Sequence, residues 1–470
     1  MSDSVMAPPG AAPGAPADPP PARPPAAPAA PPAGRLCGWG RVYVPGAEVF
    51  GEDLARATEG AVLTRGLGRS YGDSSLPPPS HPVVVNTTLA DRLLSFDEAT
   101  GLLRCEAGAS LLQLNQLFLP RCWFTPVSPG TQFVTVGGMV ASDIHGKNHH
   151  RDGCFGEHVE EILLRVADGR IVRCTATEES ELFRATIGGM GLTGHILEVA
   201  FRMRKIPSPW IKMESERVPD IDAYVAGLKA AGPDWPFTMG WIDCLSRGDK
   251  LGRGILMRGR WARADEAPSR FAPMGRRIGM PFVLPSFVMG PLTVRAFNMC
   301  YYGVHPRLGK RALVHPQKFF YPLDAIEHWN RLYGPRGFTQ YQCVLPEAAG
   351  ISVARRFLEL LTGRGGASFL CVIKDCGPEG TGMLSFPMPG ISIAVDLPIR
   401  KNMQELVDAL NEFVVREGGR IYLTKDTFTR PEHFRQMEPR LTEWQRVRDR
   451  WDPDHRLRSA QSVRMFGDRP

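Results

Sequence analysis

The stretch of sequence that decides the fold reads Arg65-Gly66-Leu67-Gly68-Arg69-Ser70-Tyr71-Gly72-Asp73. A second glycine-rich segment begins at Pro129-Gly130-Thr131 and continues through Val134-Thr135-Val136-Gly137-Gly138 to Asp143-Ile144-His145-Gly146-Lys147-Asn148-His149-His150. Glycine has no Cβ, so the backbone N–H groups of such segments can approach a phosphate closely. Two of these segments, each with a polar or basic tail, predict a ligand with two phosphates and a large body, which means a dinucleotide.

Two common nucleotide-binding motifs do not match these segments. A Rossmann fingerprint needs a third glycine followed by a helix. Here Tyr71 stands where the third glycine would be, and the polar, turn-rich run 73–79 follows it. A P-loop needs Gly-Lys-Ser/Thr, which the sequence lacks. NAD binding in a doubly wound sheet is therefore disfavoured.

Length and composition predict a two-domain globular protein. The chain has 470 residues, too many for one hydrophobic core, and its net charge of +7 permits an anionic partner without establishing one. The ten cysteines are mostly scattered, and the pair Cys371 and Cys376 has no partner pair at metal-like spacing, which indicates a reducing compartment. His149 and His150 lie near His145, but no Asp or Cys set at zinc spacing accompanies them, so we expect no metal.

Composition and periodicity divide the chain into four parts. Residues 1–34 are almost entirely Pro, Ala and Gly, which predicts a disordered tail without the features of a secretory signal. We expect an α+β domain over 35–207, a second domain on an antiparallel sheet over 208–419, and a return to the first domain over 420–470. The elements behind this division are strands at 83–86, 102–108, 196–201, 341–344, 369–374, 391–396 and 420–426, a hairpin at Asp168-Gly169, and helices at 110–119 (N-capped by Ser110), 179–186 and 406–414 (ended by Gly418-Gly419).

One segment of the second domain is unusually apolar. No charged residue occurs from Ile278 to Val294, while Arg276, Arg277 and Arg295 flank the segment. A membrane span needs about 20 apolar residues, and three prolines interrupt this shorter run. Two interpretations stay open: a buried irregular loop, or an apolar flap edged by arginine that touches a lipid or a bilayer.

The two glycine segments resemble those of the vanillyl-alcohol-oxidase-type flavoproteins, and within them the decaprenylphosphoryl-β-D-ribose 2-oxidase family is most similar. The likeness continues to the end of the chain and implies a two-subdomain PCMH-type FAD-binding domain with a substrate (cap) domain. Further matching motifs lie at 191–194, 320–324, 329–330, 333–335, 340–342, 384–387 and 425–426.

The resemblance implies FAD as the cofactor. Many members attach FAD through a histidine at the position of Arg69, and a guanidinium cannot form that bond, so we expect non-covalent FAD. The residues that match cofactor-binding positions are Arg65, Gly66, Leu67, Gly68, Arg69, Ser70, Tyr71, Gly130, Thr131, Thr135, Val136, Gly137, Gly138, Ser142, His145, Ile196 and Tyr422.

The resemblance also implies catalytic and substrate-binding residues. Lys425, His145 and Tyr71 match catalytic positions. The residues that match substrate-binding positions are Tyr321, Gln340, Gln342, Lys374 and Lys425. Two positions depart from the family: Ala394 stands where some members have cysteine, and Ser392 replaces a common asparagine.

The implied reaction is oxidation of the 2-hydroxyl of a polyprenylphosphoryl-β-D-ribose to a keto sugar, in cell-wall arabinan synthesis. A separate NAD(P)-dependent short-chain reductase would complete an epimerisation to arabinose. We expect a cytoplasmic protein, or one peripheral at the inner membrane, with no transmembrane helix. The first alternative is an oxidase of soluble aldonolactones or alditols. The second is a non-catalytic membrane or nucleic-acid binder, although only two aromatics, Trp261 and Phe271, are interleaved with the arginines of 253–277, so we expect no nucleic acid.

Overall fold

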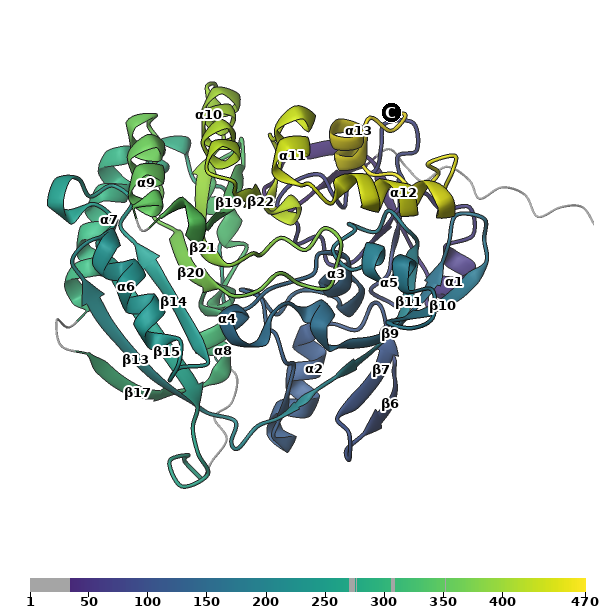
Figure 1. Cartoon of the computed structure of the whole chain (residues 1–470), viewed down its shortest axis with the longest axis horizontal. Helices are drawn as coiled ribbons and strands as arrows, with labels where there is room; N and C mark the ends of the chain where they lie inside the picture. The colour runs from purple at the N-terminus through teal and green to yellow at the C-terminus, as the bar shows by residue number, and fades with distance from the viewer. Residues whose placement is uncertain (1–33, 270–274, 276, 306–308, 351) are drawn as a thin grey trace, which may run out of the picture. The chain divides into compact units, whose positions relative to one another are not determined.

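The computed structural model of the protein describes residues 34–269, 275, 277–305, 309–350 and 352–470. The predicted tail at 1–34 therefore lies outside the described residues except for Gly34, and so does Arg276. The described part combines helices with several sheets, as predicted, and two of the sheets are large (Figure 1).

The smaller of these two sheets has five antiparallel strands in the order β10-β9-β11-β7-β6. Its strands are β6 (Leu93–Asp97), β7 (Leu102–Glu106), β9 (Val159–Arg165), β10 (Ile171–Thr175) and β11 (His195–Arg202). The predicted hairpin at Asp168-Gly169 is confirmed, since β9 pairs antiparallel with β10 across it. The predicted capped helix is α2 (Leu111–Phe118), in which Ser110 and Gln113 form a capping box.

Short strands lead the chain into the first glycine segment. β3 (Ala47–Phe50), β5 (Val83–Asn86) and β4 (Thr64–Arg65) form a parallel three-stranded sheet, and β4 ends where that segment begins. The remaining short pairs are β1 (Arg35–Cys37) with β2 (Tyr43–Pro45), and β8 (Trp123–Phe124) with β12 (Arg204–Lys205).

The larger sheet has eight antiparallel strands in the order β17-β13-β15-β14-β20-β21-β19-β22, as expected for the second domain. Its strands are β13 (Ile211–Val218), β14 (Phe237–Ile242), β15 (Gly254–Trp261), β17 (Lys310–Val314), β19 (Phe338–Pro346), β20 (Cys371–Cys376), β21 (Gly390–Pro398) and β22 (Arg420–Ile421). The helices α6 (Ile221–Ala231), α9 (Val353–Gly363) and α10 (Met403–Arg416) lie beside it (Figure 1).

Alternation along the strands separates the two faces of this sheet. Tyr341 of β19 stacks on Phe357 of α9 and donates a hydrogen bond to Asn411 of α10 at 2.9 Å. Gly240 of β14 lies against Tyr224 of α6, where a Cβ would sit only 1.1 Å from the phenol oxygen. The face that carries these residues is therefore covered by helices, and the residues between them in sequence point to the opposite face.

The C-terminal part departs from the prediction of a strand over 420–426. β22 ends at Ile421, and η8 (Leu423–Lys425) is a 3₁₀ turn in which Lys425 N donates to Tyr422 O at 2.9 Å. The strand prediction was wrong beyond Ile421, because the chain makes a tight turn there and does not continue as a strand of the sheet. The chain continues through α11 (Pro431–Met437), α12 (Leu441–Trp451) and α13 (Ala460–Phe466).

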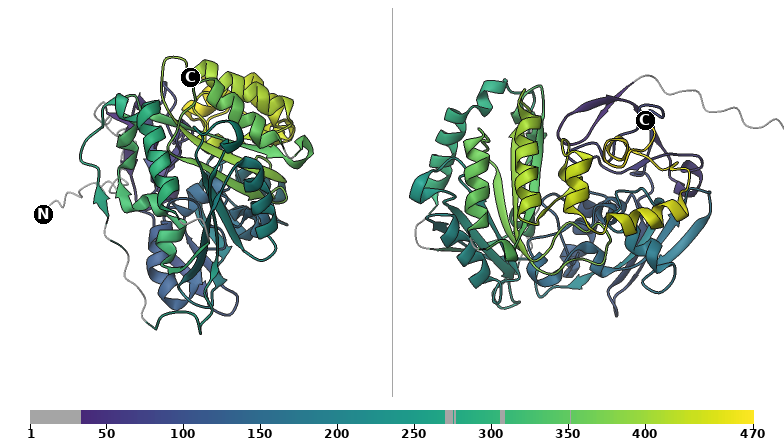
Figure 2. Two further views of the ribbon diagram at one scale, coloured as in Figure 1. Left: turned by 90° about the vertical axis from the view of Figure 1, so that its left-hand side faces the viewer. Right: turned by 45° about the horizontal axis from the view of Figure 1, so that its top comes forward.

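These last helices pack against the first part of the chain. Trp444 of α12 donates a hydrogen bond to Ala185 of α5 (Ser180–Thr186) at 3.0 Å. Arg464 of α13 forms an ion pair with Asp73 at 2.8 Å, directly after the first glycine segment. Figure 2 shows the yellow C-terminal helices beside the purple and blue N-terminal segments. The predicted domain bounds themselves stay predictions.

The apolar segment is neither a buried loop nor a single helix. It contains β16 (Ile278–Gly279), η4 (Ser286–Met289) and the first turn of α7 (Pro291–Val304), and Pro291 occupies the first helical position. Phe287 is 77% exposed and Leu292 is 81% exposed, so the buried-loop alternative is wrong for these side chains. Within the described residues, no helix has the length and apolar character needed to cross a bilayer.

The elements not yet named are short. The helices are α1 (Leu54–Ala57), α3 (Val136–Ala141), α4 (His149–Asp152) and α8 (Pro316–Phe320), and the 3₁₀ turns are η1 (Leu119–Arg121), η2 (Phe155–His158), η3 (Gly248–Lys250), η5 (Pro322–Ala325), η6 (Trp329–Tyr333) and η7 (Glu347–Ala349). β18 (Ile326–Glu327) pairs in parallel with β16.

Candidate active site

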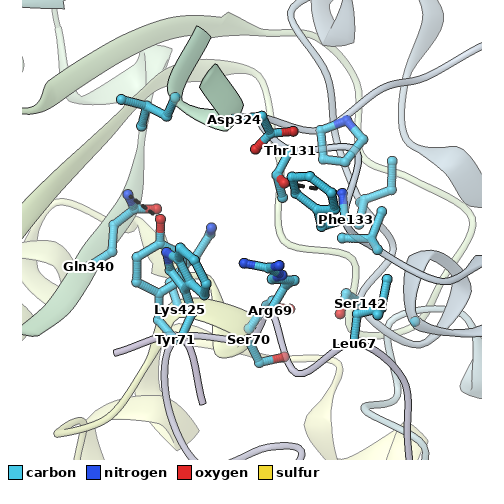
Figure 3. A pocket seen from close by; sticks show the side chains of 18 of the residues that line it. Leu67, Arg69, Ser70, Tyr71, Thr131, Phe133, Ser142, Asp324, Gln340 and Lys425 are labelled. Atoms are coloured by element: carbon cyan, nitrogen blue, oxygen red, sulfur yellow. Dashed lines mark hydrogen bonds between the residues drawn. The ribbon is translucent and has the colours of Figure 1, made fainter. Parts of the chain in front are cut away.

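A cavity of about 700 Å³ joins the two glycine segments to the face of the large sheet opposite α6, α9 and α10. Arg69, Tyr71 and Lys425 point into it, with Thr131 and Asp324 near its opposite wall (Figure 3). Residues far apart in sequence thus meet around one volume that is large enough for an extended ligand.

The first glycine segment presents backbone N–H groups without protein partners. Among the described residues, the amides of 66–70 donate no hydrogen bond. A Cβ on Gly66 would lie 2.2 Å from Thr135 Oγ1, and Gly68 has φ +62°, so both positions depend on glycine. Consecutive free amides beside a cavity form a binding site for an anion such as a phosphate.

Part of the second segment is helical. Residues 136–141 form α3, whose N-cap is Thr135. The amides of Val136 and Gly137 already donate to Ala109 and Ala107, each at 2.8 Å, so they are not available to a phosphate. Gly137 is required for a close approach, because its Cβ would lie 2.9 Å from that of Ala107. Gly137 therefore shapes the cavity wall through its close packing and not through its own N–H group.

The two arginines of the first segment have different surroundings. Arg65 donates to Cys37 O at 2.8 Å and pairs with Glu48 at 2.8 Å, so its guanidinium braces the N-terminal strands. Arg69 stacks at 4.1 Å from the centroid of the Trp39 ring, and its buried Nε has no partner among the described residues. Burial lowers the pKa of Arg69 to about 10. Arg69 is thus a cation packed against an aromatic ring, and its Nε–H group remains available to donate a hydrogen bond.

His145 is held neutral at the cavity wall. Lys374 Nζ donates to its Nδ1 at 3.2 Å, and the Gln342 amide lies 3.0 Å from its Nε2. Burial, reinforced by the charge of Lys374, lowers the pKa of His145 well below its usual range. The atom of Gln342 that faces the imidazole is its amide Nε2, which also donates a hydrogen bond to Ser392 Oγ at 3.1 Å.

Lys425 lies beside a buried polar network on this same face of the large sheet. Its Nζ lies 4.0 Å from the centroid of the Tyr71 ring. Gln340 lies 3.5 Å from the Tyr71 hydroxyl and also donates to Asp396, which accepts a second hydrogen bond from Tyr333 at 2.9 Å. Burial raises the pKa of Asp396 to about 7 and lowers the pKa of Lys425 to about 7. Both groups can therefore exchange protons near neutral pH.

Two more lysines border the same cavity. Burial lowers the pKa of Lys374 to about 8 and the pKa of Lys147 to about 7. Lys147 Nζ donates to Phe320 O at 2.8 Å. The positive charge of Lys374 contributes to the lowered pKa of both Lys147 and Lys425, so Lys374 lies within electrostatic range of each of the other two amines.

Most of the residues predicted for the site line this cavity, and two do not. Val136 is fully buried in the core, and Tyr321 bonds to Ser128 and Asn115 (the latter at 3.1 Å) away from the cavity. The predicted residues that line it are Arg65, Gly66, Leu67, Gly68, Arg69, Ser70, Tyr71, Gly130, Thr131, Thr135, Gly137, Gly138, Ser142, His145, Ile196, Gln340, Gln342, Lys374, Tyr422 and Lys425.

Three residues at the site were not predicted from sequence. Asp396 stands third in the alternation Ser392, Ala394, Asp396, which marks a polar face in an otherwise apolar strand. Lys147 follows His145 by two positions within the glycine segment itself. Asp324 accepts a hydrogen bond from Gln132 N, and no local sequence pattern predicts that contact. Within the described ranges, the His, Cys, Asp and Glu side chains form no group of three that could hold a metal ion.

The residues present fit FAD. A free-amide segment suits a pyrophosphate, and the cavity continues from it to a wall with neutral His145 and the amine of Lys425. An elongated cofactor with phosphates in its middle and a ring system at one end matches this order of groups. The fold and the cavity together define an FAD-dependent oxidoreductase.

Comparison with known proteins specifies the family. A model of the FAD binding domain matches residues 53–175. The decaprenylphosphoryl-β-D-ribose oxidase of Mycolicibacterium smegmatis is 35% identical over 92% of this chain and 97% of that protein. An uncharacterized Streptomyces coelicolor protein is 31% identical over 73% of this chain and 96% of its own length. A putative D-arabinono-1,4-lactone oxidase of Neurospora crassa is 29% identical over 32% of this chain and 26% of that protein. The chain belongs to the decaprenylphosphoryl-β-D-ribose oxidase family.

Proposed function

We propose that this protein oxidises the 2-hydroxyl of a polyprenylphosphoryl-β-D-ribose to the corresponding keto sugar. The observation that carries the proposal is the cavity that joins the free amides of 66–70 to Lys425 and Tyr71, which lie beside the Gln340–Asp396 pair. The relative from Mycolicibacterium smegmatis, which matches over nearly the whole chain, supports the choice of substrate.

FAD, when bound, supplies the acceptor for the hydride that leaves the carbinol carbon. The chain must supply a base for the hydroxyl proton, and Lys425 is our candidate. With a pKa of about 7, a large fraction of its amine is unprotonated at neutral pH. The Tyr71 ring and the Gln340–Asp396 pair fix the position of this amine and its electrostatic surroundings.

His145 and Tyr422 have a positioning role in this proposal. Tyr422 donates to Ser142 O at 2.8 Å, and its ring lies 5.4 Å from that of His145. Because His145 is neutral and both ring nitrogens have partners, it is better suited to contact a flat cofactor ring than to take up a proton. The predicted cofactor and substrate residues that line the cavity keep their proposed roles.

Arg69 leads us to propose that the FAD is bound without a covalent bond. Its guanidinium takes the place of the histidine that attaches FAD in many related flavoproteins. It is packed between Trp39 and Phe133, at 4.1 and 4.9 Å from the two ring centroids. A cation in this position can interact with the cofactor by charge and hydrogen bonds alone.

The exposed apolar surface next to the cavity suits the lipid part of the substrate. Phe297 and Tyr301 of α7 both line the cavity, and Phe297 is also 46% exposed. Beyond them α7 and η4 expose Phe287, Leu292 and Met299 to solvent. We propose that this surface rests on a bilayer and passes the prenyl chain to the cavity, which would place the protein at the face of the inner membrane.

The chemistry implies a partner. A 2-keto sugar phosphate is a product that a separate NAD(P)-dependent short-chain reductase can reduce from the opposite face. The two reactions together would epimerise ribose to arabinose, as cell-wall arabinan synthesis requires.

Anaerobic reduction of the flavin tests the proposed function. Polyprenylphosphoryl-β-D-ribose should bleach the bound flavin, and soluble aldonolactones and alditols should not. Bleaching by the soluble sugars alone would instead establish the aldonolactone or alditol oxidase. Purified protein without any flavin would favour a non-catalytic binder.

A further inference from the structure

Lys147 and Lys374 both line the cavity, and among the described residues no carboxylate pairs with either amine. Lys147 Nζ contacts the carbonyl oxygen of Phe320, and Lys374 Nζ contacts His145 Nδ1. Within the described part of the chain, neither amine forms an ion pair with a carboxylate, and the acid that acts on Lys147, Asp324, is not bonded to it. Removing an ammonium group from water without a counter-ion is costly.

The direction of both pKa shifts agrees with this picture. Burial is the main cause at each lysine, and the charge of Lys374 adds to the effect at Lys147. An anion placed between the two amines would offset both causes, because its negative charge would stabilise the protonated amines in place of water. Each ammonium also keeps unused N–H donors, since each has three and makes one hydrogen bond here.

The substrate class brings such an anion to this place. In a sugar that carries its phosphodiester on C1 and is oxidised at C2, the phosphorus lies only a few bonds from the reacting carbon. The phosphodiester must therefore lie close to the groups that handle the C2 hydroxyl. Lys374 is in contact with His145 and electrostatically coupled to Lys425, so it lies beside those groups.

Resting on the proposed function, we propose that Lys147 and Lys374 form an anion subsite that binds the anomeric phosphodiester of the substrate. The subsite makes the phosphate, and not only the prenyl chain, a determinant of specificity. A neutral riboside lacks the group that this subsite binds, and it leaves two buried cations uncompensated.

Stopped-flow flavin reduction by two substrates tests this proposal. The substrates are a polyprenylphosphoryl-β-D-ribose and an alkyl β-D-riboside without the phosphate. For the phosphoryl sugar, Lys374→Met and Lys147→Met should each raise the half-saturating concentration about tenfold or more. For the neutral riboside the change should stay within about threefold. Lys374→Arg should recover part of the affinity, and Lys401→Met, at an exposed lysine, serves as the matched control.

A binding measurement without turnover separates this proposal from the proposed function. Inorganic phosphate and ribose 1-phosphate are titrated into the oxidised holoenzyme, and the flavin absorbance is followed. Both should perturb the spectrum of the wild type and of Lys401→Met, with dissociation constants raised about tenfold in the two methionine variants. If ribose 1-phosphate perturbs the spectrum and inorganic phosphate does not, the subsite is still supported, and it binds the phosphate only when the sugar is attached.

The outcomes are distinct. Equal losses for the charged and neutral substrates would overturn the subsite and assign the lysines to the flavin or to the fold. Unchanged saturation with the phosphoryl sugar would also overturn it, while flavin reduction by that sugar would leave the proposed function intact. Conversely, the anions could bind in a lysine-dependent way while no ribose substrate reduces the flavin. That result would reject the proposed function and still support an anion site.

Discussion

The Nζ atom of Lys425 lies 4.0 Å from the centroid of the Tyr71 ring, so this amine rests on an aromatic face and not against a carboxylate. The first residue comes from the C-terminal 3₁₀ turn η8 and the second from the first glycine segment. This contact joins an N-terminal and a C-terminal segment of the chain at the point where we propose that proton transfer takes place.

The rate of flavin reduction should depend on the protonation of Lys425. A base acts only when it is unprotonated, so the rate should rise with pH through about 7, the pKa of Lys425, and level off above it. Lys425→Met should lower the rate about 10²–10⁴-fold and remove this step in the pH profile. Rapid-mixing absorbance measurements across pH 5–9 provide the check. A variant that keeps the wild-type rate and profile would exclude Lys425 as the base.

Asp396 should set the position of that step. Its negative charge raises the pKa of Lys425, whereas Lys374 lowers it, and Tyr71 and His145 face the same amine as uncharged groups. Since Asp396 itself has a pKa of about 7, the two groups titrate as a pair. Asp396→Asn should leave a single step in the pH profile of flavin reduction, at a lower pH than in the wild type. A displacement to higher pH would contradict this assignment, and an unchanged flavin spectrum controls for misfolding.

Local sequence patterns predicted the elements that depend on local chemistry. The capping residue Ser110 and the hairpin turn at Asp168-Gly169 were both found correctly, because caps and tight turns are determined by a few adjacent residues. The strand predicted over 420–426 failed for the opposite reason. Its apolar run Ile421-Tyr422-Leu423 resembles a strand, and only contacts with the distant Gln342 and Ser142 show why the chain turns at Tyr422.

Site residues that belong to one sequence motif could be predicted. Site residues that are brought together by strand pairing could not. The glycine segments indicated the part of the cavity wall that they form themselves, without a structure. Asp396 needed the register of β19 and β21, which places it opposite Gln340. The engaged amides of Val136 and Gly137 could not be foreseen either, since glycine content does not reveal that a segment is a helix packed against Ala107.

Gly66 should be intolerant of a side chain. A Cβ there would lie 2.2 Å from Thr135 Oγ1, the atom that caps α3, so either the free-amide segment or the cap must shift. We expect Gly66→Ala to lower the FAD content of purified protein several-fold, measured as flavin absorbance per protein. Gly363→Ala in α9 is the matched control, because its Cβ would meet open space. Full FAD occupancy in Gly66→Ala would show that this loop does not hold the cofactor.

The flavin should leave the protein on acid denaturation. Arg69 cannot form the covalent bond that histidine forms in many related flavoproteins, and its cation can be replaced by solvent once the fold is lost. After precipitation with acid, the yellow colour should appear in the supernatant, and the pellet should show no flavin fluorescence. Colour retained in a washed pellet would mean that another residue attaches the FAD.

The exposed apolar surface of η4 and α7 should bind a bilayer. Phe287 and Leu292 are 77% and 81% exposed, and each apolar side chain that leaves water contributes about 1.5–3 kcal/mol. Phe287→Asp combined with Leu292→Asp should therefore lower co-sedimentation with anionic phospholipid vesicles at least tenfold. Phe50→Asp, at a 55% exposed phenylalanine of β3, should change it little. Equal losses in both variants would point to a general effect of added negative charge, and no loss in either would place the bilayer contact elsewhere on the molecule.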